Sequence, residues 1–120
     1  MELSLQLELL ELAKAMGREA GELLSQRPSG FELSTKSNEI DFATQMDKAS
    51  EAHIVSRIRS ARPDDGVIGE EGSNIPSKSG ITWVIDPLDG TVNYVYNIPG
   101  WNVSIAAKDS VGVQVGVVSA

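Results

Sequence analysis

The sequence has 120 residues, 41% hydrophobic and 22% charged, which suits one domain with a modest core. Its net charge of −7, without a basic cluster, argues against a nucleic-acid polymer or an anionic membrane as partner. With no cysteines, it has neither a disulfide framework nor a thiol nucleophile. The N-terminus lacks the pattern of a secretion signal, and no apolar stretch reaches the roughly 20 residues that cross a bilayer, so a cytoplasmic location is expected.

The N-terminal segment has the periodicity of an amphipathic helix. We expect this helix to run through about Gln26 and to stop at Arg27-Pro28-Ser29-Gly30. Its apolar stripe, which would face a core or a partner, comprises Leu5, Leu9, Leu12, Met16 and Leu23.

The next segment is predicted to contain a strand and a second helix. Phe31 to Lys36 would form the strand and enter a hairpin at Ser37-Asn38. The helix would run from about Thr44 to Ser60, with Val55, Ile58 and Ala61 packed on a sheet. Thr44 with Asp47 three residues later fits a helix N-cap, which is a purely structural explanation of both residues.

The helix is expected to close at Arg62-Pro63-Asp64-Asp65-Gly66, where Asp64 and Asp65 read as turn residues. His53, the single histidine, is interpreted as structural or solvated. Neither acid nor the histidine is therefore a predicted site residue.

Two later segments each run from apolar residues into paired acids. Val67-Ile68-Gly69 leads to Glu70-Glu71-Gly72, and Trp83-Val84-Ile85 leads to Asp86-Pro87-Leu88-Asp89-Gly90-Thr91. Because Mg²⁺, Mn²⁺ and Ca²⁺ prefer oxygen ligands, Asp86, Asp89 and the Leu88 carbonyl are candidate ligands, and Glu70 can complete the set. The ordinary alternatives are a polar turn at the glutamates and a surface strand with an Asp-Gly turn.

A helical turn that starts at Asp89 or Gly90 would provide a phosphate site. The N–H groups of Gly90 and Thr91 would have no partner within that turn and could bind phosphate oxygens. Metal and phosphate would then share one pocket.

The C-terminal segment reads as a hairpin. Val103 to Ala107 and Val111 to Val118 flank Lys108-Asp109-Ser110, and valines alternate along the second strand. The element order predicts an α+β fold, with helices on one face of a mainly antiparallel sheet. The last strand would be an uncovered edge.

Three motifs in order resemble the inositol monophosphatase family of metal-dependent, lithium-sensitive sugar phosphatases. They are Asp41 to Asp47 (D-x-x-T-x-x-D), Gly69-Glu70-Glu71 (GEE) and Asp86 to Thr91 (DPxDGT). The resemblance runs from about Lys36 to the last residue and includes the first helix only in its pattern. It implies the N-terminal part of the layered αβαβα sugar-phosphatase fold.

The resemblance also implies roles for individual residues. Glu70, Asp86, the Leu88 carbonyl and Asp89 would hold two or three Mg²⁺ ions, and Leu88 to Thr91 would line the phosphate. Asp47 and Thr91 would orient the attacking water, and Glu70 would join them in catalysis. Lys36 resembles a residue of the family's mobile loop, although a solvated hairpin lysine is an equal alternative.

Family members are considerably longer than 120 residues and are commonly dimers. We therefore expect a single N-terminal domain, residues 1–120, without the C-terminal half of the family fold and weakly active or inactive alone. The expected substrate is a small phosphorylated polyol or sugar, first of all inositol monophosphate. Fructose bisphosphate, histidinol phosphate and phosphoadenosine phosphate remain alternatives.

Two alternatives lie outside this phosphatase family. Haloacid dehalogenase-type enzymes also place acids and DGT after a strand, but only one residue separates their two acids, whereas Pro87 and Leu88 separate Asp86 from Asp89. The other alternative is a regulatory module that binds metal without turnover.

Overall fold

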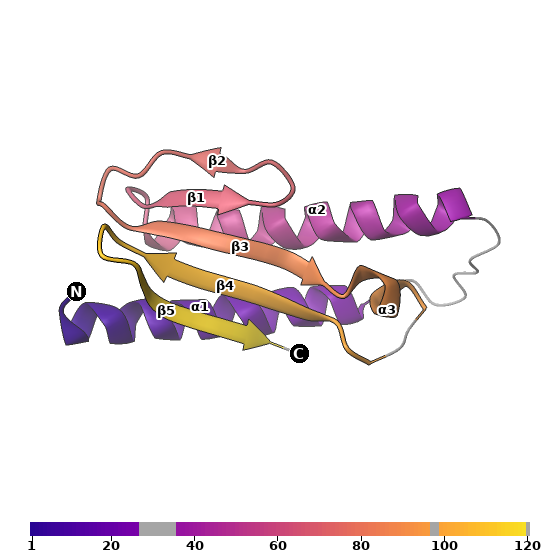
Figure 1. The fold of residues 1–120 in the computed structure, drawn as a ribbon, viewed down its shortest axis with the longest axis horizontal. Helices are drawn as coiled ribbons and strands as arrows, with labels where there is room; N and C mark the ends of the chain where they lie inside the picture. The colour runs from indigo at the N-terminus through magenta and orange to yellow at the C-terminus, as the bar shows by residue number, and fades with distance from the viewer. Residues whose placement is uncertain (27–35, 97–98, 120) are drawn as a thin grey trace.

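The computed structural model describes residues 1–26, 36–96 and 99–119, and the side chains of residues 36–42, 92 and 95 lie outside that description. It has two layers, one of long helices and one a five-stranded sheet (Figure 1). The elements are α1 (Leu3–Ser25), α2 (Lys36–Ala61), β1 (Gly66–Gly69), β2 (Asn74–Ile75), β3 (Thr82–Asp89), α3 (Thr91–Val95), β4 (Asn102–Lys108) and β5 (Val113–Ser119).

The strands lie in the order β2-β1-β3-β4-β5, and α1 and α2 pack against the same face of the sheet (Figure 1). β1 and β3 are parallel, and the other neighbouring strands are antiparallel. The predicted α+β fold with a mainly antiparallel sheet is confirmed.

The core lies between the helices and the inward-facing residues of the sheet. Strand β3 contributes Trp83 and Ile85, and β4 contributes Val103 and Ile105, in the alternation expected of a sheet with one covered face. The fully buried stripe of α1 is turned slightly from the predicted one and comprises Leu9, Ala13, Met16, Ala20 and Leu24. Leu5, Leu12 and Leu23 pack at its margin.

The start of the second helix differs from the prediction. The sequence suggested a hairpin at Ser37-Asn38 and a helix from Thr44, but α2 begins at Lys36. Residues 36–61 contain no glycine or proline, so the weak turn preference of Ser-Asn does not interrupt the helix. Thr44 and Asp47 therefore lie inside the helix rather than at its N-cap. Of the strand predicted for Phe31 to Lys36, residues 31–35 lie outside the described residues, and Lys36 belongs to α2.

The packing of the second helix also differs in detail. Ile54 and Ile58 are fully buried and Val55 is partly buried, whereas Ala61 is exposed at the helix end. The predicted packing on the sheet is right for Ile58 and wrong for Ala61. Among the described helices, none is long and apolar enough to cross a membrane.

Asp65 is more than a turn residue, because its side chain is 1% exposed. Its carboxylate accepts hydrogen bonds from two guanidinium nitrogens of Arg62, the hydroxyl of Ser79 and the indole N–H of Trp83. Paired in this way, a buried acid joins the end of α2 to β3.

The predicted C-terminal hairpin is confirmed as β4 and β5. β5 forms the edge of the sheet, where Val113 and Val118 are 67% and 68% exposed. The edge strand is therefore uncovered, as expected from the sequence.

Candidate functional site

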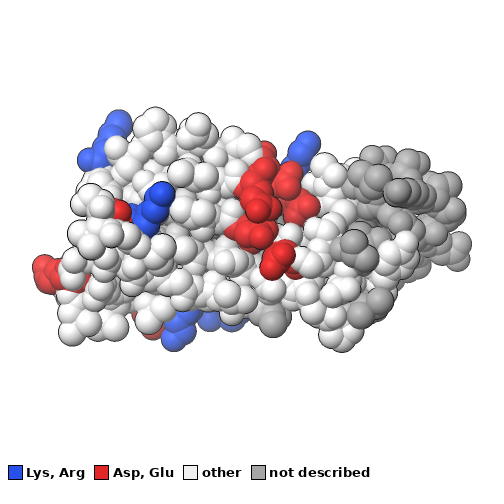
Figure 2. Space-filling model, viewed as in Figure 1, with Lys and Arg blue, Asp and Glu red and all other residues white. Residues whose placement is uncertain are grey.

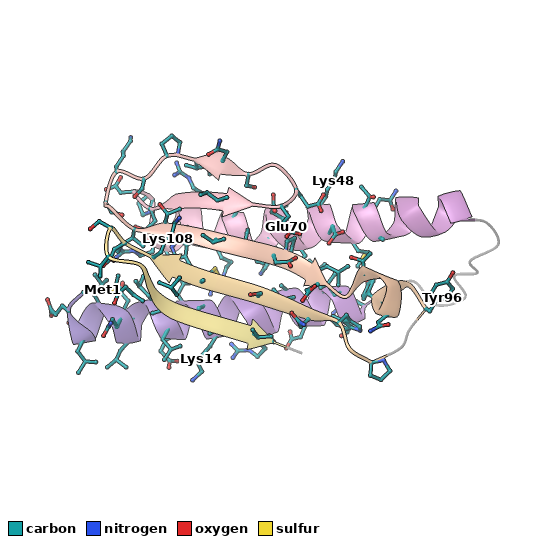
Figure 3. The ribbon with its side chains drawn as sticks, in the orientation of Figure 1. Met1, Lys14, Lys48, Glu70, Tyr96 and Lys108 are labelled. Carbon is teal, nitrogen blue, oxygen red and sulfur yellow. The ribbon has the colours of Figure 1, made fainter. Side chains whose placement is uncertain are left out.

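The parallel pairing of β1 and β3 brings the two acid-bearing segments together. Gly69, the last residue of β1, pairs with Ile85 of β3. Glu70 and Asp86 are the next residues along these two chain segments. Carboxyl ends of parallel strands lie at the same edge, which places these two acids side by side. Figure 3 shows Glu70 at the end of β1, close to α2.

The charges of these acids act on one another. The negative charge of Asp86 is the main cause that raises the pKa of Glu70, with burial, a hydrogen bond to Asp86 and the charges of Glu71 and Asp89 adding to it. Four acids from the ends of β1 and β3 therefore share one site.

Helix α2 adds Asp47 to the cluster. Burial is the main cause that raises the pKa of Asp47 to about 7, and the charges of Glu71, Asp86, Glu70 and Glu51 add to it. Figure 2 shows Asp and Glu side chains gathered into one patch on this face of the molecule. Such mutual repulsion makes the cluster a place where a cation would be favourable.

The donors are carboxylate oxygens, the type that hard divalent cations prefer. Within the described part of the chain, Oδ1 of Asp86 is the one buried side-chain oxygen or nitrogen without a hydrogen-bond partner. An unpartnered buried carboxylate oxygen is costly unless a cation neutralises it. No group of three or more described Asp, Glu or His side chains is itself arranged to hold a metal. Mg²⁺ commonly uses one or two carboxylates and completes its shell with other oxygens, including water.

A bulge shapes the end of β3. Asp86 pairs with Ser104 and Asp89 with Asn102, so three steps along β3 correspond to two along β4. Pro87 lies inside β3, and the strand continues past it through a bulge that accommodates the missing N–H. Bulges of this kind redirect side chains and carbonyls.

Gly90 and Thr91 lie where the predicted helical turn begins. Gly90 has φ +80°, and a Cβ on it would lie 2.4 Å from the Gly100 carbonyl oxygen. α3 starts at Thr91, and the Tyr94 N–H donates to the Gly90 carbonyl oxygen at 3.0 Å. The turn is therefore present, and phosphate binding there stays a prediction.

The remaining predicted residue, Lys36, is the first residue of α2 rather than part of a hairpin. The sequence missed Ser50 and Glu51, which are buried beside the acid cluster. Both follow Asp47 by three or four residues, so all three lie on one face of the helix that was predicted from about Thr44. This spacing is the sequence signal that could have identified them.

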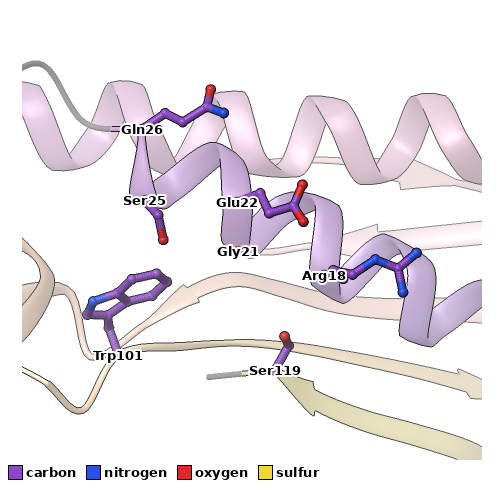
Figure 4. A pocket seen from close by; sticks show the side chains of 7 residues that line it. All are labelled: Arg18, Gly21, Glu22, Ser25, Gln26, Trp101 and Ser119. Atoms are coloured by element: carbon purple, nitrogen blue, oxygen red, sulfur yellow. The ribbon is translucent and has the colours of Figure 1, made fainter.

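Three hollows differ in how many of the clustered acids line them. One of about 310 Å³ on the outer face of the sheet is lined by Ile68, Gly69, Glu70, Val84, Ile85, Asp86, Ser104 and Ala106. A larger one of about 540 Å³, shown in Figure 4, is lined by Arg18, Gly21, Glu22, Ser25, Gln26, Trp101 and Ser119. That hollow includes none of the clustered acids. A third, of about 400 Å³, is lined by Lys48, Glu51, Ala52, Val55, Ser56, Glu71 and Ser73 and includes one of them. Only the first includes both Glu70 and Asp86, so we place the candidate site there.

The fold and the acid cluster define a class of α+β proteins with an acidic site where a parallel strand pair ends. The family model described as "Inositol monophosphatase family" matches residues 5–120, and the chain belongs to this family. The match includes α1, which the sequence motifs had linked to the family only by pattern.

Relatives carry two kinds of name. Nus factor SuhB of Pasteurella multocida is 40% identical over 114 residues, which are 92% of this chain and 42% of that protein. Inositol-1-monophosphatase of Bacillus subtilis is 35% identical over 114 residues, covering 92% and 43%. The native crystal structure of extragenic suppressor protein suhB from Bartonella henselae has a TM-score of 0.76 and 31% identity, covering 92% and 43%. The chain thus spans less than half the length of these relatives.

Proposed function

We propose that the full-length protein hydrolyses phosphate monoesters with the help of Mg²⁺, and that inositol monophosphate is its preferred substrate. One observation carries the proposal: β1 and β3 bring Glu70 and Asp86 together, and a buried Asp86 oxygen has no partner among the described residues. Membership of the inositol monophosphatase family supports phosphatase chemistry.

Each predicted residue has a role in this proposal. Glu70, Asp86, Asp89 and the Leu88 carbonyl would hold Mg²⁺, two or three ions in all. Bound cations would supply Lewis acidity, which activates water and offsets the charge on the phosphate and the leaving oxygen.

The other residues would bind and orient. The carboxylate of Asp47 and the hydroxyl of Thr91 would hold the attacking water by hydrogen bonds, with Glu70 beside them. The backbone from Leu88 to Thr91 would seat the phosphate. Lys36 would act near the site from the N-terminal end of α2 rather than from a loop.

Phosphate release from the full-length protein tests the proposal. The substrates would be inositol monophosphate, fructose bisphosphate, histidinol phosphate and phosphoadenosine phosphate, each with Mg²⁺ and with Mg²⁺ plus Li⁺. We expect Li⁺-sensitive turnover of inositol monophosphate, and Asp86→Asn should reduce it at least about 100-fold. Turnover that persists in Asp86→Asn would overturn the assignment of the site.

A regulatory role is the second candidate, and the names of the relatives favour it. Seven relatives that match this chain at 38% to 40% identity carry the name Nus factor SuhB. A folded full-length protein that binds Mg²⁺ but releases no phosphate from any of these substrates would support this role. A cytoplasmic location and a homodimer are part of either proposal.

A further inference from the structure

Glu51 is a buried acid that the proposed chemistry does not use. Its side chain is 4% exposed, and it extends from α2 toward the turn after β1. Oε1 accepts the N–H of Glu71 at 2.9 Å, and Oε2 accepts the N–H and the hydroxyl of Ser73 at 3.1 and 2.7 Å. All three donors belong to the turn that carries Glu70 and Glu71.

The turn is built closely around this carboxylate. A Cβ on Gly69 would lie 2.3 Å from Oε1 of Glu51, so the carboxylate occupies the space that a side chain at position 69 would need. The turn is closed by hydrogen bonds from the Gly69 N–H to the Ser73 carbonyl and from the Gly72 N–H to the Gly69 carbonyl. The turn is therefore held by its own backbone hydrogen bonds and by the carboxylate of Glu51.

Ser50 makes a similar contact with the second acid-bearing segment. Its buried hydroxyl donates a 2.9 Å hydrogen bond to the Pro87 carbonyl oxygen, inside the bulge between Asp86 and Asp89. Residues three and four positions apart share one face of a helix, so Asp47, Ser50 and Glu51 all face the ends of β1 and β3. One turn of α2 thus contacts both segments.

We propose that Glu51 is a positioning residue that holds the turn of Glu70 and Glu71 in register with Asp86, and thereby sets the affinity of the site for Mg²⁺. Ser50 fixes the other segment from the same helical turn. This inference rests on the proposed function, because it assigns Glu70 and Asp86 to the metal. Partners that orient ligands typically change metal affinity or activity by about 10- to 100-fold when removed.

The chemistry of the contact favours glutamate over glutamine. A carboxylate accepts at both oxygens, whereas the amide of glutamine is a donor at one end. In Glu51→Gln, the amide would face either the N–H of Glu71 or the donors of Ser73, and in both orientations at least one buried donor would lose its partner. The turn should loosen while the helix and the sheet stay formed.

Asp65 provides a matched control for loss of a buried acid. It lies directly before β1, it is almost fully buried like Glu51, and its carboxylate accepts four side-chain hydrogen bonds. Asp65→Asn removes a similarly buried carboxylate at the start of β1, whereas the turn of Glu70 and Glu71 lies at the end of β1. It should lower stability without changing the affinity for Mg²⁺.

The experiment measures Mg²⁺ binding by calorimetry in the full-length wild type, Glu51→Gln and Asp65→Asn. Amide hydrogen exchange at Glu71 and Ser73 is measured on the same proteins. We expect Glu51→Gln to bind Mg²⁺ about 10- to 100-fold more weakly and to exchange faster at both amides. Asp65→Asn should match the wild type in both respects.

Three outcomes would overturn the inference. Equal Mg²⁺ affinity in Glu51→Gln and wild type would show that the turn does not set the site. An equal loss in Glu51→Gln and Asp65→Asn would assign the effect to general destabilisation. A folded wild type that binds no Mg²⁺ would overturn the proposed function, and the inference with it.

A milder variant keeps the test decisive if Glu51→Gln does not fold. Ser73→Ala removes one of the three hydrogen bonds to Glu51 and leaves the carboxylate in place. We expect it to weaken Mg²⁺ binding about fivefold. Unchanged binding and unchanged exchange at Glu71 in Ser73→Ala would count against the inference.

Discussion

The indole Nε1 of Trp83 donates a 2.9 Å hydrogen bond to Oδ2 of Asp65, and both side chains are almost fully buried. Trp83→Phe would remove this donor and leave a small cavity beside the carboxylate. We expect the free energy of unfolding to fall by roughly 2 to 4 kcal/mol, measured by urea unfolding. Asp64→Asn changes an exposed neighbour and should stay within about 0.5 kcal/mol of the wild type.

Gly90→Ala should destabilise the turn into α3. The new Cβ would require an unfavourable positive φ and would lie against the Gly100 carbonyl. We expect a loss of about 1 to 3 kcal/mol in the same unfolding measurement. Gly116→Ala is the control, since a Cβ there meets nothing within 4 Å. An equal loss in both variants would contradict the structural explanation.

Stability should depend on pH through Asp47. Its pKa is about 7 in the folded chain, against an ordinary value of 3.8, so the folded state holds this proton more tightly than the unfolded state. This group therefore makes the metal-free protein less stable as pH rises from about 4 to about 7, with no further change above. Asp47→Asn removes this contribution.

Urea unfolding across this pH range, in the presence of a chelator, measures the effect as the difference between wild type and Asp47→Asn. The variant should gain stability relative to wild type as pH rises to about 7. A constant difference across the range would refute the raised pKa. Titration of the Asp47 carboxyl by NMR would measure it directly.

Tyr94 ties the short helix α3 to the end of α1. Its hydroxyl donates a 2.7 Å hydrogen bond to the Leu24 carbonyl, and its ring meets Trp101 edge-on at 5.2 Å. Tyr94→Phe keeps the ring contact and loses the hydrogen bond, so we expect a loss of about 1 kcal/mol. The near-ultraviolet circular dichroism signal of Trp101 should remain, because the ring contact is kept. Its disappearance would show a wider rearrangement.

Much of the fold follows from local patterns. The 3.6-residue periodicity of α1 and the alternating valines of β5 identify both elements, because each buries one face. The acids at 70, 86 and 89 stand out because each follows an apolar strand. These features are encoded within a few neighbouring residues.

Other features depend on contacts between distant segments. Thr35 is a residue type that can cap a helix starting at Lys36, but the Ser37-Asn38 pair after it also favours a turn. The bulge at Pro87 depends on the pairing of β3 with β4. Asp65 looks like a turn residue until Trp83 and Ser79 are placed around it. Glu51 is likewise an ordinary helical glutamate until the turn at 69–73 folds onto it.

The pairing of Gly69 with Ile85 also has a thermodynamic consequence. A one-residue slip between β1 and β3 would turn Glu70 to the opposite face of the sheet, so no small displacement of the strands gives a partly assembled acid pair. β3 lies at the centre of the sheet, where opening requires nearly complete unfolding. The pair of acids should therefore persist on heating until the whole domain melts, and disappear in the same transition.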